Sequence, residues 1–148
     1  MLVGFDKSTS ERSIHVFKQT ADLAARAQQL ERKVRAHEQL VKRIAEKASH
    51  NHLSTHSSAY IDLLVDSKWL VEAKSLGDDA VRQARAALSQ LYHYRFEYRD
   101  ELPSLILVAA FTDRPLHSGK DLGIFLETCG IAVVWAAQDR FEGTDAAT

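Results

Sequence analysis

The sequence of 148 residues has little of what marks secreted, disulfide-bonded or membrane proteins. Its single cysteine, Cys129, excludes an internal disulfide and is typical of a reducing compartment. It has no apolar run of about eighteen residues and no Lys- or Arg-led apolar leader, so it predicts neither a membrane span nor export. We therefore expect a cytoplasmic protein without a membrane partner.

An excess of charge of one sign is also missing. The 19 Lys and Arg residues against 20 Asp and Glu leave a net charge of −1, which excludes a generally basic coat for nucleic acid. A local strip of Lys and Arg would still suffice to contact phosphates. Glycine loops of the GxGxxG or Walker type are absent, so nucleotide binding of those kinds is not predicted. The composition, 45% hydrophobic and 26% charged, is that of an ordinary globular domain.

The N-terminal third predicts helix. Residues 10–48 lack Gly and Pro and are rich in good helix formers, which predicts one long helix or two helices with a break near 28–35. Small residues around Leu23 suit close helix packing. We therefore expect residues 1–35 to form a helical extension that packs on a partner chain, giving a homodimer, and residues 36–148 to form the main domain.

The remaining sequence alternates between strand and helix patterns. We expect a hairpin of strands, then a helix that begins at Asp79, a buried strand, a loop, a helix closed by Gly130 and a last buried strand, after which the chain frays. The hairpin strands are expected at 59–66 and 68–75, and the helix after them at 79–98. The buried strand is expected at 104–111, the loop at 112–119, the second helix at 120–129 and the last strand at 131–137. This order predicts an α/β fold in which helices flank a mixed β-sheet.

Charged residues stand inside the apolar hairpin YIDLLVDSKWLVEAKS. With the turn at 66–68, Asp62 lies opposite Glu72, at a Cβ separation of about 4.5 to 5.5 Å. Two carboxylates this close repel each other unless a proton or a cation lies between them. Mg²⁺ prefers such oxygens, and the Ala73 carbonyl would supply a third ligand. Lys74, on the same face, would hold the attacking water and offset phosphate charge.

Simpler interpretations remain open. Asp62 and Glu72 could instead be rim charges at an open end of the sheet, with Lys74 neutralising Glu72. The histidines at 50, 52 and 56 are not accompanied by a further ligand at zinc-site spacing, so a structural zinc site is not predicted. Cys129 fits a small buried apolar residue.

Asp62 followed by Glu72-Ala73-Lys74 resembles the D…(D/E)xK signature of the PD-(D/E)xK, or restriction-endonuclease-like, nuclease superfamily, although Ile61 replaces the proline of the motif. The resemblance implies a restriction-endonuclease-like core. It also implies Mg²⁺, with Mn²⁺ as a substitute, bound by Asp62 and Glu72, and Lys74 assisting the nucleophilic water. Glu38, on the first core helix, is the candidate for an additional metal ligand.

A second motif lies on the helix at 79–98. Gln90 and Tyr94 resemble the QxxxY motif of one branch of this superfamily, and their spacing places them on one helical face. The resemblance gives Gln90 a role at the catalytic site and Tyr94 a role in contacting DNA. Arg82 and Arg95 on the same helix are candidates for phosphate contacts.

The resemblance implies a Mg²⁺-dependent nuclease that hydrolyses DNA, in a restriction, repair or anti-phage system. The alternative is a non-catalytic module with the nuclease fold, which binds DNA or protein and dimerises through the N-terminal helix.

Overall fold

The computed structural model describes residues 2–77 and 79–144, with side chains from residue 21 onward. The chain divides into two compact units, residues 1–34 and residues 35–148. The first helix, α1, is continuous from Leu2 to His50, so the possible break near 28–35 does not occur. The absence of Gly and Pro from residues 10–48 gives the helix no residue that would interrupt it.

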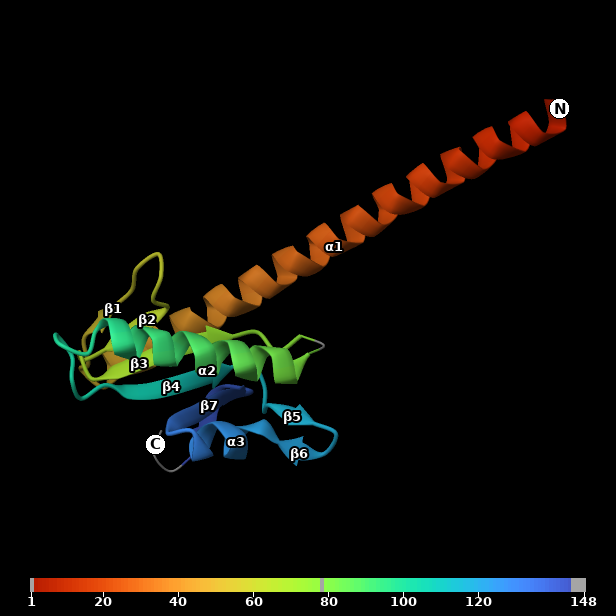
Figure 1. Ribbon diagram of the computed structural model, residues 1–148. Coiled ribbons are helices and arrows are strands. Elements are labelled where there is room, and N and C mark those ends of the chain that lie inside the picture. The colour runs from red at the N-terminus through yellow and green to blue at the C-terminus, as the bar shows by residue number, and fades with distance from the viewer. Residues whose placement is uncertain (1, 78, 145–148) are drawn as a thin grey trace. The chain divides into compact units, whose positions relative to one another are not determined.

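A six-stranded mixed sheet forms the centre of the second unit (Figure 1). The strand order is β1-β2-β3-β4-β7-β8. Strands β3, β4 and β7 are parallel neighbours, whereas β1, β2 and β8 pair antiparallel. The bounds are Thr55–His56 for β1, Leu63–Val65 for β2, Trp69–Lys74 for β3, Ile106–Phe111 for β4, Ile131–Ala137 for β7 and Arg140–Gly143 for β8. The predicted α/β class with a mixed sheet flanked by helices is confirmed.

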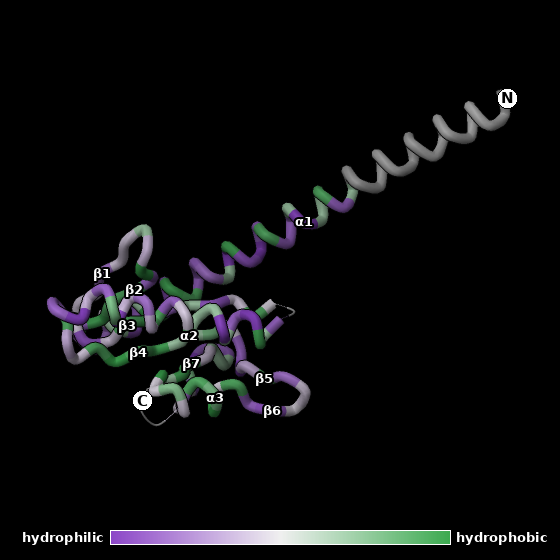
Figure 2. Tube along the Cα trace, viewed as in Figure 1, coloured by the Kyte–Doolittle hydropathy of each residue, from purple (hydrophilic) through white to green (hydrophobic). Residues whose placement is uncertain are grey.

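Helices cover both faces of this sheet. Helix α2 (Ala80–Glu97) and helix α3 (Leu122–Thr128) pack on one face in an apolar cluster that includes Leu70, Leu91 and Phe111. Residues of α1 from Leu40 to Ala48 pack on the other face. The parallel strands are therefore apolar along most of their length, as Figure 2 shows for β3, β4 and β7.

The caps of α2 and α3 follow from their sequences. Asp79 accepts a hydrogen bond from the Arg82 amide at 3.0 Å, and Asp121 accepts one from the Gly123 amide at 2.8 Å. Gly130 follows α3 with a φ of 79°, a conformation that glycine adopts without steric cost. The predicted helix start at Asp79 and the closing role of Gly130 are confirmed.

Three predicted segments are wrong in detail. Residues 59–62 are not strand but part of a local turn. The Ser58 hydroxyl accepts a hydrogen bond from the Ile61 amide at 3.1 Å, and the Ser58 amide donates one to the Ile61 carbonyl at 3.0 Å. The expected loop 112–119 takes part in a small hairpin of β5 (Leu116–His117) and β6 (Lys120–Asp121). Residues 141–143, expected to fray, belong to β8 and pair with β7.

Candidate active site

Asp62 lies where three elements meet, immediately before β2. The register Leu63↔Val71 and Leu64↔Leu70 confirms the predicted hairpin pairing up to Leu63, and Asp62 follows as the next residue before the strand. The Asp62 Oδ2 atom accepts a hydrogen bond from the Ala73 amide at 2.9 Å and lies 3.1 Å from His37 Nε2. Helix α1, β2 and β3 therefore jointly hold this carboxylate in one orientation.

Glu72 is the one charged side chain that is buried among the residues the structure describes, at 6% exposure. Lys74 Nζ lies 3.3 Å from its Oε1 atom. Burial and the negative charge of Asp62 raise the pKa of Glu72 to about 7, against the opposing effect of Lys74. A side-chain hydrogen bond with Asp62 acts in the same direction as burial, so the two carboxyl groups are close together.

The pKa of Asp62 moves the other way. Burial favours its neutral form, but the hydrogen bonds from His37 and Ala73, with the positive charge of Lys74, outweigh burial and lower its pKa. The hydrogen bond to Asp62 raises the pKa of His37 against the effect of burial. Two neighbouring carboxyl groups thus have pKa values pushed apart, an arrangement typical of sites that carry out acid–base or metal chemistry.

A cavity of about 270 Å³ opens beside Asp62. Glu38 lines it together with His37 and Asp62, so the structure brings the predicted acidic residue of the first core helix close to the site. Glu38 itself is exposed, and the α1 residue that contacts Asp62 is His37. Sequence reasoning missed His37. The available signal was a polar residue in the apolar stripe of α1, between Val34 and Val41.

Helix α2 brings Gln90 and Tyr94 toward the same region. Burial and the charges of Glu72 and Asp62 raise the pKa of Tyr94, which places its phenol within electrostatic reach of both acids. One turn earlier, Gln90 Oε1 is buried and has no hydrogen-bond partner, alone among the buried side-chain polar atoms that the structure describes. A buried acceptor without a donor is costly in a fold, and such an atom often serves a ligand.

The two predicted phosphate contacts lie on the outside of α2. Arg82 is exposed in the first turn of the helix. The exposed Arg95 guanidinium stacks 4.7 Å from the centroid of the Tyr92 ring. Neither arginine is among the contacts of Asp62 or Glu72 that the structure describes, so both are exposed residues outside the acidic cluster.

The Ala73 carbonyl faces the Asp62 side of β3. The Lys68 carbonyl accepts a hydrogen bond at 2.8 Å from the amide of the first β4 residue. The Lys74 carbonyl accepts one at 3.3 Å from the amide just past the end of β4. Since backbone groups alternate in direction along a strand, the Ala73 amide and carbonyl point the opposite way, toward β2. The Ala73 amide does donate to Asp62, as this alternation requires.

The carboxylates of Asp62 and Glu72 and the Ala73 carbonyl are the oxygen atoms of this site that could hold a metal ion. Among the described residues there is no group of three or more His, Cys, Asp or Glu side chains that could hold a metal. Mg²⁺ usually takes one or two carboxylates and keeps several waters. Asp62, Glu72 and the Ala73 carbonyl match that requirement, and a cation there would relieve the repulsion that raises the pKa of Glu72.

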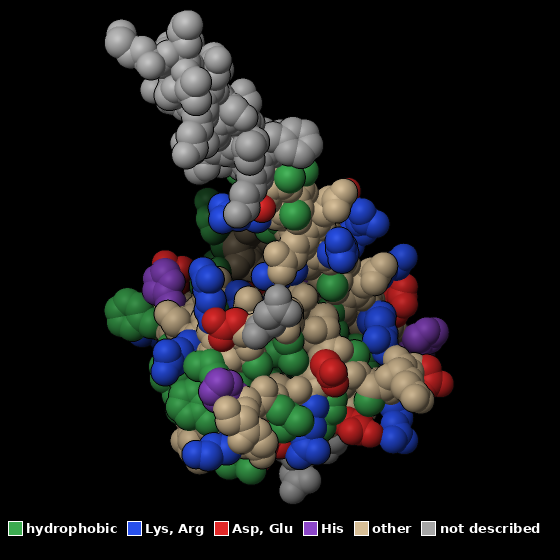
Figure 3. Space-filling view, turned by 90° about the vertical axis from the view of Figure 1, so that its right-hand side faces the viewer, with side chains coloured by type: hydrophobic (Ala, Val, Ile, Leu, Met, Phe, Trp, Pro, Cys, Tyr) green, Lys and Arg blue, Asp and Glu red, His purple; other side chains and the backbone are tan. Residues whose placement is uncertain are grey.

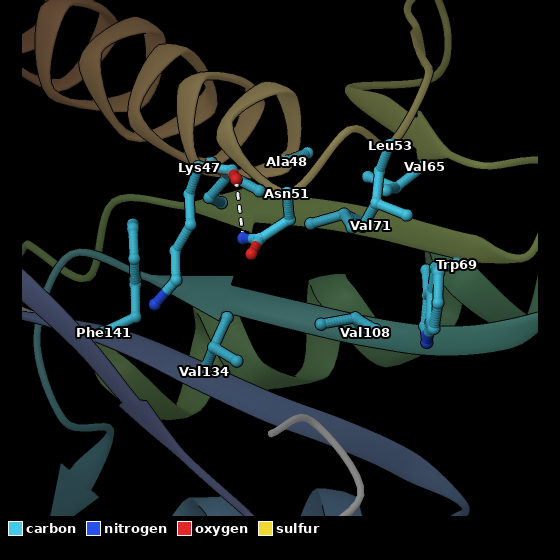
Figure 4. Close-up of a pocket in the computed structure, with 11 residues that line it drawn as sticks. Lys47, Ala48, Asn51, Leu53, Val65, Trp69, Val71, Val108, Val134 and Phe141 are labelled. Carbon is cyan, nitrogen blue, oxygen red and sulfur yellow. Dashed lines mark hydrogen bonds between the residues drawn. The ribbon is translucent and has the colours of Figure 1, made fainter.

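A larger cavity, of about 520 Å³, lies on the α1 face of the sheet (Figure 4). Valines of β3, β4 and β7 form its floor, and Trp69 and Phe141 stand at its two ends. Lys47 and Asn51 reach over it from the end of α1, where the side-chain Nδ2 of Asn51 donates a hydrogen bond to the Lys47 carbonyl at 2.9 Å. No carboxylate is among the residues that line this cavity, whereas Glu38 and Asp62 line the smaller one.

No family model matches the sequence, and no similar chain was found among curated proteins or solved structures. Among the described residues, no helix is long and apolar enough to cross a membrane.

Proposed function

We propose that this protein is a Mg²⁺-dependent phosphodiesterase that cleaves DNA. The observation that carries the proposal is the buried Glu72, held beside Asp62 with Lys74 Nζ at 3.3 Å. The order of β2, β3, α2 and β4, with an antiparallel pair followed by a parallel one, agrees with the restriction-endonuclease-like core that the motif implies.

Asp62, Glu72 and the Ala73 carbonyl would hold the ion. A bound Mg²⁺ would supply charge stabilisation at the scissile phosphate and a more acidic water. The Lys74 ammonium would orient the attacking water and offset negative charge on the phosphate. Gln90 Oε1 would accept a hydrogen bond from that water or from Lys74. This bond would give the buried Gln90 oxygen the donor that it lacks. His37 would keep the Asp62 carboxylate ionised and correctly turned.

DNA is proposed as the substrate because of the motif that the sequence resembles. Arg82 and Arg95 on α2, with Tyr94 closer to the acids, would contact the phosphate backbone. On the face shown in Figure 3, Lys and Arg side chains are scattered among acidic and apolar ones rather than gathered in one strip. Such a surface fits a few local phosphate contacts better than an extended basic groove.

Replacing Lys74 with methionine tests this proposal directly. Methionine keeps the length and apolar stem of lysine but removes the ammonium group, so we expect DNA cleavage to fall by on the order of 10²- to 10³-fold. Supercoiled plasmid incubated with Mg²⁺ measures the rate, and chelation of Mg²⁺ should stop it. The matched control is Lys68→Met at the exposed β2–β3 turn, which should cut at the parental rate. Equal cutting by both variants would rule out the assigned role of Lys74.

Thermal unfolding with and without Mg²⁺ tests the metal site. Because a proton on Glu72 competes with the ion and its pKa is about 7, Mg²⁺ should raise the melting temperature more at pH 8 than at pH 6. At a Mg²⁺ concentration of about 100 times Kd, the stabilisation should reach about 3 kcal/mol. The Asp62→Asn variant should lose this response, whereas a variant at the exposed Asp66 should keep it.

The alternative, a non-catalytic module for DNA or protein binding, is favoured by one observation. The acids already have cationic partners in the chain, His37 for Asp62 and Lys74 for Glu72. Structural ion pairs of this kind need no metal. A melting temperature that is insensitive to Mg²⁺ and Mn²⁺, together with intact plasmid, would favour this second function.

A further inference from the structure

The apolar residues of α1 within 21–34 have the spacing of a coiled coil. Leu23, Ala27, Leu30 and Val34 recur at alternating steps of four and three residues. Their large side chains are open to solvent, with Leu23 at 62%, Leu30 at 63% and Val34 at 47% exposure. An exposed stripe of large apolar side chains at this spacing indicates burial against another helix.

The same stripe continues in the second unit. There Val41, Ile44 and Ala48 keep the alternating spacing and pack against the chain's own sheet. Within the described part of the chain, Leu23, Leu30 and Val34 stay exposed, so we look to a second molecule for the surface that would bury them.

The charges beside the stripe indicate what that molecule is. With Leu23 and Leu30 at the d positions of the heptad, Arg26 falls at a g position and Glu31 at an e position. In a parallel pair of identical helices, each g residue faces the e residue five positions later on the other helix. Arg26 of each copy then faces Glu31 of the other, so opposite charges meet twice across the two-fold axis.

The direction of the pair follows from the residues at these positions. The g positions carry the cations Arg26 and Lys33, and Glu31 is the acidic e residue within the stripe. An antiparallel alignment would instead place Arg26 and Lys33 against g residues and Glu31 against e residues, which brings like charges together. Valine at an a position with leucine at d further favours two strands.

We propose that residues 21–34 of α1 form a parallel, in-register, two-stranded coiled coil with a second copy of this chain. The partner is identified by self-complementarity: one stripe of apolar side chains, flanked by charges that attract only when identical helices run side by side in the same direction. This interface does not depend on the proposed nuclease activity, so the failure of one proposal leaves the other intact.

A charge-swap experiment on the full chain tests the pairing. The single variants Arg26→Glu and Glu31→Lys each place like charges together, so we expect their dimer dissociation constants, from sedimentation equilibrium, to rise about five- to tenfold. An equimolar mixture of the two variants should recover parental affinity, because both cross-helix pairs are then attractive. The double variant that carries both substitutions should also recover parental affinity, because its two cross-helix pairs again join opposite charges. The matched control is Arg32→Glu, an equal change of charge at the outward f position, which should leave the dissociation constant unchanged.

Cross-linking tests the direction and register. In a Cys129→Ser background, Leu23→Cys and Val34→Cys should each form an intermolecular disulfide between identical positions, because d and a residues of a parallel pair lie opposite their own copies. Cross-linking of position 23 to position 34 in a mixture of the two would show an antiparallel pair and overturn the proposal. A monomer at every concentration, a trimer, or equal effects of Arg32→Glu and Arg26→Glu would overturn it as well.

Discussion

Replacing Glu72 with glutamine should reduce DNA cleavage by on the order of 10²- to 10³-fold or more while making the folded protein more stable above pH 7. The amide keeps the shape of the side chain but cannot carry the charge that a metal ligand needs. The same charge is unfavourable in the fold, because Glu72 is buried and lies beside Asp62. Loss of activity with gain of stability is the expected mark of a functional buried carboxylate.

The sign and pH range follow from the raised pKa of Glu72. Below about pH 4.5 the carboxyl group is neutral in both the folded and unfolded states, so it has no effect on the pH dependence of stability. As pH rises to about 7 the unfolded state ionises first, and the free energy of unfolding of the parental protein falls. Above pH 7 the free energy of unfolding of the glutamine variant should therefore exceed that of the parental protein by about 1 to 3 kcal/mol, since the pKa of Glu72 already includes the effect of Lys74.

Urea denaturation of both proteins at pH 4.5, 6 and 8 measures this difference. The control is Glu127→Gln, a glutamate exposed on α3, whose stability should follow that of the parental protein at every pH. A glutamine variant at position 72 that is less stable at pH 8 would show that the Glu72–Lys74 pair stabilises the fold. The interpretation of these acids as a structural ion-pair cluster would then be correct.

Truncating Phe111 to alanine should lower the free energy of unfolding by about 3 to 5 kcal/mol. Phe111 is fully buried, at 0% exposure, in the cluster beneath α2 with Leu70 and Leu91. It pairs in register with Lys74 on the neighbouring strand, so the cavity would open next to the acidic site. Both transfer of the ring to water and the space left behind contribute to the loss.

Chemical denaturation measures the effect, with Phe125→Ala as the control. Phe125 lies on α3 and is 42% exposed, so its truncation should cost a small fraction of that amount. If the two variants lose equal stability, Phe111 does not lie in a tightly packed core. Activity of the Phe111 variant, measured well below its melting temperature, would show how far the packing under β4 positions Lys74.

Local sequence signals determined most of the secondary structure. The hairpin register followed from the tight turn at 66–68 and the alternation around it, and the pairing Leu64↔Leu70 confirms it. The cap at Asp79 was predictable because an aspartate before a helical pattern satisfies free amides of the first turn. The unbroken apolar run 104–111 identified a central strand, since a strand covered on both faces has no polar side.

Other segments were not predictable because distant residues decide them. The strand β8 exists because β7 offers it a free edge to pair with, and the polar sequence around Glu142 gives no local sign of that edge. Leu70 on the hairpin is 1% exposed because α2 covers its face of the sheet, and nothing in the hairpin sequence predicts that cover. The covering helix comes from a later part of the chain.

Sequence alone thus determined that Asp62 and Glu72 face one another, because strand register is set by neighbouring residues and the turn between them. Only the tertiary structure decided their electrostatics. His37 reaches Asp62 from a helix 25 positions earlier in the chain, and α2 and β4 bury Glu72. Burial and charge depend on every group within a few ångströms, whatever its place in the sequence, so the divergence of the two pKa values required the folded chain.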